Sequence, residues 1–135
     1  MRDIIFRGKR IDNGEWIHGC LSHDKTPNNT YAFIDGEFKG VQRVESETVG
    51  QFTGVHDKNL IKIFEKDIVK RCYGVTYSTK QYPSFTDNTA IEEIAVIEYE
   101  HAGYDFLQLP PDPNFDVTFE VIGNIHDNPE LLEAV

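Results

Sequence analysis

The sequence has few cysteines and no long hydrophobic run. Its 135 residues include only Cys20 and Cys72, too few for a four-cysteine zinc site and, in a chain without an export signal, more typical of free thiols than of a disulfide. The longest apolar runs are a few residues, far short of the roughly 20 that span a bilayer. The first residues also contain no apolar stretch of signal-peptide length. We therefore expect a soluble, cytoplasmic protein with no membrane partner.

Basic residues are nearly missing from the second half of the chain. Residues 1–71 hold 12 Lys or Arg and 11 Asp or Glu, whereas residues 72–135 hold one basic residue, Lys80, and 12 acidic ones. Nucleic-acid binders usually present a basic face, and only the N-terminal residues offer one. We expect no DNA or RNA binding near physiological salt, because the net charge of −10 repels phosphates. DNA mimicry by the acidic face is the one related role that the charge allows.

The acidic half itself has two interpretations. Solvent-exposed carboxylates keep a protein soluble and need no further cause. The same residues could also form a surface that meets a basic partner. Both interpretations remain open at this point.

Motifs for catalysis and phosphate binding are also missing. The chain contains no nucleophile elbow, no P-loop and no Gly-x-Gly-x-x-Gly sequence. His56-Asp57 and His126-Asp127 could hold a divalent metal only if they met in space, and an Asp in a polar turn favours ordinary turn residues instead. The sequence predicts no catalytic residue, no metal and no cofactor, and it leaves enzyme status open.

Short alternating apolar segments separated by turn residues make up most of the chain, which predicts one mainly β domain over residues 1–135. Asp12-Asn13-Gly14 and Asp35-Gly36 are hairpin-turn signals. Residues 91–99 are apolar on both faces and predict an interior strand, residues 103–109 predict a further strand, and the polar residues 78–90 predict a mobile hairpin tip. Asp127 to Leu132 predicts a short helix at the end of the chain.

The expected core consists of apolar residues at inward-facing strand positions, with Trp16, the only tryptophan, as its main anchor. Val41 and Val44 are also expected to face inward. The full expected core is Phe6, Trp16, Val49, Phe52, Ile63, Ile68, Val69, Val75, Ile94, Val96, Phe119, Val121, Ile122 and Leu131.

Three segments resemble the YopX family of phage and prophage proteins, in the right order and over nearly the whole chain. They are Ile5-Phe6-Arg7 with Trp16, residues 49–69 with Val49-Gly50-Gln51-Phe52-Thr53-Gly54 and Ile63-Phe64-Glu65-Lys66-Asp67-Ile68-Val69, and Glu120 to Ile125 leading to Asn128-Pro129-Glu130. Leu60 and Lys66 stand in turns where the family usually has glycine. The resemblance implies a small SH3-like β-barrel with a β-rich extension and a short C-terminal helix, in a phage-derived bacterial setting, and no established activity.

The leading functional hypothesis is a phage-derived, non-catalytic binding module that contacts a host or phage protein, since short open sheet edges suit added peptide strands. The alternative is a small ligand-binding protein or enzyme with a polar pocket. Its candidate binding residues surround two glycines and are Gln51, Thr53, His56 and Asp57. A homo-oligomer is compatible with either hypothesis.

Overall fold

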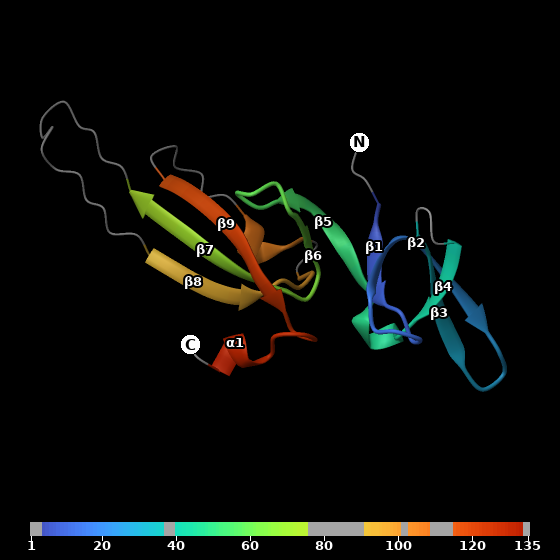
Figure 1. Ribbon diagram of the computed structural model, residues 1–135. Helices are drawn as coiled ribbons and strands as arrows, with labels where there is room; N and C mark the ends of the chain where they lie inside the picture. Colours follow the sequence, from blue (N-terminus) through green and yellow to red (C-terminus); the bar gives the residue numbers. More distant parts are fainter. Residues whose placement is uncertain (1–3, 37–39, 76–90, 101–102, 109–114, 134–135) are drawn as a thin grey trace, which may run out of the picture. The chain divides into compact units, whose positions relative to one another are not determined.

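Most of the chain folds into short strands, as Figure 1 shows. The computed structural model describes residues 4–36, 40–75, 91–100, 103–108 and 115–133. Two units form: residues 1–54 with 62–65, here the first unit, and residues 55–61 with 66–135, the second unit. Two antiparallel sheets confirm the mainly β fold class. One domain over residues 1–135 stays a prediction.

The elements in chain order are β1 Phe6–Lys9, β2 Trp16–Lys25, β3 Thr30–Gly36, β4 Gly40–Val44, the 3₁₀ helix η1 Ser46–Thr48, β5 Gly50–His56, β6 Lys62–Phe64, β7 Asp67–Val75, β8 Ile91–Val96, the 3₁₀ helix η2 Asp105–Leu107, β9 Phe115–Asn124 and α1 Glu130–Glu133.

The first unit is built on a six-stranded sheet in the order β4-β3-β2-β1-β5-β6. The turn predicted at Asn13-Gly14 joins β1 to β2: Asn13 Oδ1 accepts the N–H of Glu15 at 3.0 Å, and Gly14 has φ +72°. This turn sets the register that places Lys9 opposite Trp16. Side chains alternate between the two faces of a strand, so the register also decides which residues share a face.

One face of this sheet carries the core of the first unit. The buried residues are Ile17, Ala32, Ile34 and Val44, with Phe6, Leu21 and Val49 packed partly against them. Trp16 lies on the opposite face and is only half-buried, so the prediction that it anchors the core is wrong. Its neighbour Ile17 has the inward position, because adjacent strand residues point to opposite faces.

The turn expected at Asp35-Gly36 is not found at these two residues. Both residues pair with β4, opposite Val41 and Gly40, so the strand continues through them. A Cβ on Gly36 would come within 2.5 Å of the Ile17 side chain, and glycine here permits close packing inside a strand rather than a reversal. Val41 is 59% exposed, so its predicted inward position is wrong, whereas that of Val44 is confirmed.

The ends of β1 and β4 approach each other. Arg10 and Val44 form an isolated antiparallel bridge, the N–H of Ile11 donates to the carbonyl of Arg43 at 3.1 Å, and the N–H of Glu45 donates to Lys9 at 2.9 Å. The sheet therefore curls, but within the described residues it does not close. The SH3-like barrel is not confirmed.

The second unit contains a three-stranded sheet in the order β8-β7-β9. β7 lies at its centre, where Ile68 and Val69 are fully buried. The prediction of an interior strand at residues 91–99 is therefore wrong, because β8 ends at Val96 on the sheet edge. Ile97, just beyond β8, is fully buried. Its backbone N–H donates to the carbonyl of Asp67 at 2.9 Å, and its carbonyl accepts the backbone N–H of Lys66 at 2.7 Å.

Residues 103–108 form no strand of the kind expected. The N–H of Leu107 donates to the carbonyl of Tyr104 at 3.0 Å in η2. In a 3₁₀ turn, residues three apart lie on the same side, so Tyr104 and Leu107 are buried together. The last strand is β9, and the predicted short terminal helix is confirmed as α1.

The rest of the predicted core is mostly found in place. Phe52, Ile63, Ile68, Val69 and Phe119 are buried. Other predicted core residues are partly buried: Phe6, Val49, Ile94, Val96, Val121, Ile122 and Leu131. The Val75 side chain and residues 78–90, with their predicted hairpin tip, lie outside the residues described.

Candidate functional site

The four residues predicted as a binding pocket are divided between the two units. Gln51 and Thr53 lie on β5 in the first unit, whereas His56 and Asp57 belong to the second. The backbone N–H of Gln51 donates to Glu65 Oε1 at 2.7 Å, and Thr53 Oγ1 donates to the carbonyl of Ile63 at 2.8 Å. Both contacts hold β6 beside β5. The binding role of the four residues stays a prediction.

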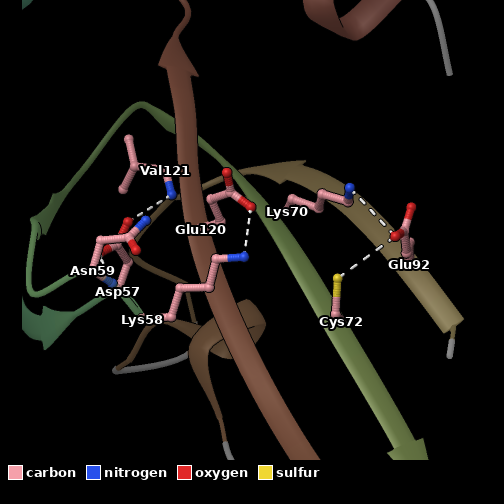
Figure 2. A network of polar contacts seen from close by, with 8 residues as sticks. All are labelled: Asp57, Lys58, Asn59, Lys70, Cys72, Glu92, Glu120 and Val121. Carbon is pink, nitrogen blue, oxygen red and sulfur yellow. Dashed lines mark hydrogen bonds and ion pairs between the residues drawn. The ribbon is translucent and has the colours of Figure 1, made fainter.

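Asp57 holds a tight turn of the second unit, as Figure 2 shows. Its Oδ1 accepts the backbone N–H groups of Asn59 at 2.8 Å and Ile61 at 2.9 Å, and its Oδ2 accepts that of Val121 at 3.1 Å. Burial raises the pKa of Asp57, but these N–H donors and the charge of Lys58 outweigh it. Its pKa is therefore held below the ordinary value of 3.8. The carboxylate fastens the 57–61 turn to β9.

The polar side chains near this turn pair across the sheet. Lys58 Nζ lies 3.1 Å from Glu120 Oε2, and this hydrogen bond is the main reason that the pKa of Lys58 is raised. On β7 and β8, Lys70 Nζ and Cys72 Sγ both approach Glu92 Oε1, at 3.3 and 3.9 Å. Figure 2 shows that these pairs lie on one side of the three-stranded sheet. Lys58 and Lys70 are thus each paired with a carboxylate on a neighbouring strand.

The two His-Asp dipeptides are built into separate turn structures. Asp127 Oδ2 accepts from Asn124 Nδ2 at 3.1 Å, and its backbone N–H donates to Asn124 Oδ1 at 2.9 Å. Asp57 is engaged by backbone donors as described above. Within the described ranges, no group of three or more His, Cys, Asp or Glu is placed to hold a metal ion.

A row of alternating cations and aromatic rings covers the face of the first unit opposite its core. The Arg7 guanidinium lies between two rings, 4.6 Å from the centre of Trp16 and 4.9 Å from that of Phe64. Lys9 Nζ lies 5.5 Å from the Trp16 ring, and the His18 ring meets Phe64 edge-on at 5.2 Å. Such distances permit attraction between a cation and a ring quadrupole.

The row continues onto β6. Phe64 packs against Phe52 with ring centres 5.7 Å apart, and Lys62 Nζ lies 5.9 Å from the Phe52 ring. Phe52 and Phe64 are each only 3% exposed. We call this side of the sheet the cation–aromatic face, and its residues are Arg7, Lys9, Trp16, His18, Lys62 and Phe64.

The pKa of His18 is affected by the positive charge of this face. Burial, and then the charges of Arg7 and Lys62, hold the pKa of His18 below its ordinary value of 6.5. The neutral form of the imidazole is therefore favoured beside these two cations. The Lys62 and His18 side chains are both exposed.

Sequence reasoning overlooked this face, although a signal for it was present. The Asn13-Gly14 turn fixes a two-strand register, and counting outward from it pairs Lys9 with Trp16 and then Arg7 with His18. Cross-strand partners on one face lie close enough to interact. The contribution of β6 could not be counted in this way, since β6 joins the sheet through β5.

A separate open hollow of about 290 Å³ lies at the other end of the first unit. In it the Arg43 guanidinium stacks over Tyr31, 4.1 Å from the ring centre. The remaining lining comes from residue 11, residues 29–32 and residues 44–47. None of the four predicted pocket residues takes part in it.

The fold is that of a mainly β protein with two antiparallel sheets and, among the described residues, no helix long and apolar enough to cross a membrane. The family model described as YopX protein matches residues 5–133. The chain therefore belongs to the YopX family.

Among solved structures, the crystal structure of protein EF1440 from Enterococcus faecalis is similar, with a TM-score of 0.48 and 22% sequence identity. The alignment covers 98% of this chain and 99% of that one. No curated protein matches the chain.

Proposed function

We propose that this protein is a non-catalytic module that binds a protein of the phage or of its bacterial host. The observation that carries the proposal is the cation–aromatic face of the first unit. It combines a half-buried tryptophan, Trp16, with the exposed polar side chains of His18 and Lys62. The phage or prophage setting comes from the family resemblance.

The residue types on this face favour recognition of another protein. Trp and Arg are enriched among the few residues that carry most of the binding energy in protein interfaces. Trp16 still exposes part of a large apolar ring, and removing the rest from water would stabilise a complex by roughly 25 cal/mol for each Å² buried. The Arg7 guanidinium lies over this ring, 4.6 Å from its centre, and supports it. A preorganised ring loses little conformational entropy on binding.

We also propose that the first unit is an SH3-like barrel in its topology. The bridge between Arg10 and Val44 supports this, because it brings β1 and β4 together from the two ends of four consecutive strands. Small barrels of this kind commonly bind peptides on one open face. The cation–aromatic face lies on two of these four strands, β1 and β2, and on β6.

Site-directed photo-crosslinking tests the proposed function. A photoreactive residue replaces Cys20, which is exposed and shares a face with His18 by strand alternation. The matched control places the same residue at Leu60, which is 82% exposed and lies in the second unit. We expect cells that naturally express the protein to yield a defined protein adduct from position 20 and not from position 60.

The adduct partner is then purified and its affinity for the unlabelled protein is measured by calorimetry. Absence of an adduct at position 20, or the same set of adducts at both positions, would refute the proposal. An adduct whose purified partner shows no binding would refute it as well.

A further inference from the structure

We propose that the open edge of β8 in the second unit accepts an extended segment of another protein as an added strand, and that this segment carries lysine or arginine. The site consists of the outward-facing backbone groups of Glu92, Ile94 and Val96. It belongs to the other unit from the cation–aromatic face, so the inference goes beyond the proposed function and does not rest on it.

The hydrogen-bond pattern of the sheet shows which backbone groups of β8 point away from β7. In an antiparallel pair, every second residue exchanges hydrogen bonds with the partner strand, and the residues between them point outward. The N–H of Ile97 donates to the carbonyl of Asp67 at 2.9 Å. Counting back from this contact along the register, the residues that face outward are Glu92, Ile94 and Val96.

The opposite edge of the same sheet, on β9, is already covered. The N–H of Lys58 donates to the carbonyl of Phe119 at 2.8 Å, and the N–H of Val121 donates to Asp57 Oδ2 at 3.1 Å. The outward groups of β8 have no such partner within the described residues, and Figure 1 shows β8 at the edge of the sheet. An unpaired edge is a template for one more strand.

The sequence of β8 does not protect this edge against a basic strand. Edge strands are commonly guarded by lysine or proline, and Ile91–Val96 contains neither. Its two charged residues, Glu92 and Glu93, are acidic, so they disfavour an acidic strand only. Ile94 and Val96 are half-buried, and a neighbouring strand with apolar residues opposite them would cover their remaining surface.

Charge favours a basic segment as the occupant. The second unit holds 5 Lys or Arg and 14 Asp or Glu, a net charge of −9. On the side of the sheet that Figure 2 shows, Lys58 pairs with Glu120, which lies opposite Lys70 in the register. Lys70 in turn pairs with Glu92. The signs alternate across the strands and end in a carboxylate at the open edge, where a cation on an added strand would continue the row.

Glu92 can accept a second cation. Its side chain is 57% exposed, and Lys70 Nζ and Cys72 Sγ both approach Oε1, which leaves Oε2 without a contact among the described residues. Just beyond the strand, Glu98 and Glu100 are exposed, and neither has an ion pair in the part of the chain that the structure describes. Carboxylates therefore flank the open edge on both sides.

The same charge disfavours a second copy of this chain as the occupant. Two copies paired through β8 would bring together two units that each carry a net charge of −9. Like charges placed across an interface oppose association. A segment with a cation opposite Glu92 gains attraction instead.

Amide hydrogen exchange of the purified full chain, resolved by residue, tests whether the edge is open. The N–H groups of Glu92, Ile94 and Val96 should exchange quickly. Those of Glu93 and Ala95, which bond to β7, should be protected. Protection of the first three at every protein concentration would show that the chain itself covers the edge. Protection that appears only at high concentration would identify a second copy as the occupant, and either result would overturn the inference.

Binding is measured by calorimetry with a short peptide in which threonines alternate with lysine, valine, isoleucine and lysine. A matched peptide carries glutamate in place of both lysines. Two further versions of the lysine peptide are N-methylated, one at the threonines and one at the residues between them. We expect the lysine peptide to bind and to protect the N–H groups of Glu92, Ile94 and Val96. The glutamate peptide should not bind, and only one methylated version should lose binding, because a strand turns alternate N–H groups toward its neighbour.

A charge reversal tests the contact with Glu92. Glu92→Lys should weaken binding of the lysine peptide roughly tenfold, because an exposed attraction becomes a repulsion of similar size. The control Asp24→Lys makes the same change in net charge at an exposed carboxylate of β2 in the first unit and should leave the affinity unchanged. Equal binding of the lysine and glutamate peptides, equal behaviour of the two methylated versions, or equal effects of the two substitutions would overturn the inference.

This result is separable from that of the proposed function. The crosslinking test uses Cys20 in the first unit and Leu60, which lies in the turn fastened to β9 and not to β8. An adduct from position 20 without binding of the lysine peptide would leave the proposed function standing and overturn this inference. Binding of the lysine peptide at β8 without an adduct from position 20 would support this inference and refute the proposed function.

Discussion

Each of the two units buries an ionised group, but by different means. Arg7 in the first unit is 9% exposed and stacks between Trp16 and Phe64. Asp57 in the second unit is 4% exposed and accepts three backbone N–H groups. A planar, delocalised cation is weakly hydrated and can rest on ring faces, whereas a carboxylate needs hydrogen-bond donors.

The two buried groups therefore have different roles: Arg7 supports a surface, whereas Asp57 holds two segments of the chain together like a staple. The rings around Arg7 are themselves part of a face with exposed cations, so the buried cation supports groups that a partner can reach. The donors around Asp57 are backbone groups of its own turn and of β9, so the buried anion ties two segments of the second unit together. The following predictions test that contrast, from the largest expected effect to the smallest.

Asp57→Ala should cause the largest loss of stability, about 3 kcal/mol in the free energy of unfolding. It removes the acceptor for three N–H groups and leaves buried donors without a partner. Urea unfolding followed by far-UV circular dichroism measures the loss. The control Asp24→Ala removes an exposed carboxylate from β2 and should change stability by less than about 0.5 kcal/mol. Equal effects of the two substitutions would contradict the staple role of Asp57.

Arg7→Ala should lower the free energy of unfolding by about 2 kcal/mol, because it removes both the stacked guanidinium and the packing of its stem. Arg7→Lys keeps the charge but loses the planar guanidinium. Its free energy of unfolding should therefore lie between those of the unsubstituted protein and of Arg7→Ala. The comparison variant is Arg43→Ala, which removes a similar stack over Tyr31 at an exposed position. Urea unfolding followed by Trp16 fluorescence measures all three. An equal loss of stability for Arg43→Ala would show that burial of the Arg7 guanidinium does not add to its contribution.

Leu60→Gly should stabilise the protein by roughly 0.5–1 kcal/mol. Leu60 has φ +66°, a conformation that costs a residue with a Cβ about 1–2 kcal/mol, partly offset by the extra freedom of glycine when unfolded. Its side chain is 82% exposed, so little packing is lost. Thermal unfolding measures the gain. The reverse test is Gly14→Ala at φ +72°, where the added Cβ has open space and only backbone strain can destabilise.

Asp57 and His18 should make the stability of the protein depend on pH in separate ranges. Asp57 has a pKa below 3.8 when folded, so the stability it contributes is present above pH 3.8 and is lost as pH falls through the folded pKa. The pKa of His18 is held below 6.5, so the unfolded state binds more protons there and stability decreases as pH falls from about 6.5. His18→Gln should flatten the upper range and Asp57→Asn the lower one, in unfolding measured across pH. A single substitution that flattened both would contradict the separation.

Local signals in the sequence determined the strands and most turns. The Asn13-Gly14 reversal, the alternation of β9 and the short helix after Asn128 depend on neighbours along the chain, and each was predictable. The departures from the family glycines at Leu60 and Lys66 were visible as well. They are the two residues other than glycine that the described structure places at positive φ, at 66° and 70°. The turns kept the backbone that glycine favours even without glycine, because the residues on both sides are held in place.

What only the tertiary structure decided is which face of each strand is turned inward and which strands meet. Trp16 and Ile17 are both apolar, and alternation alone does not choose between them; packing against Ile34 and Val44 selected Ile17. The edge position of β8 and the hydrogen bond that the N–H of Val121 donates to Asp57, 64 residues away, depend on segments far apart in sequence. The cation–aromatic face arises in the same way, because β6 brings Lys62 and Phe64 to a surface that β1 and β2 begin. Contacts of this range are set by the burial of the whole sheet, which no local pattern contains.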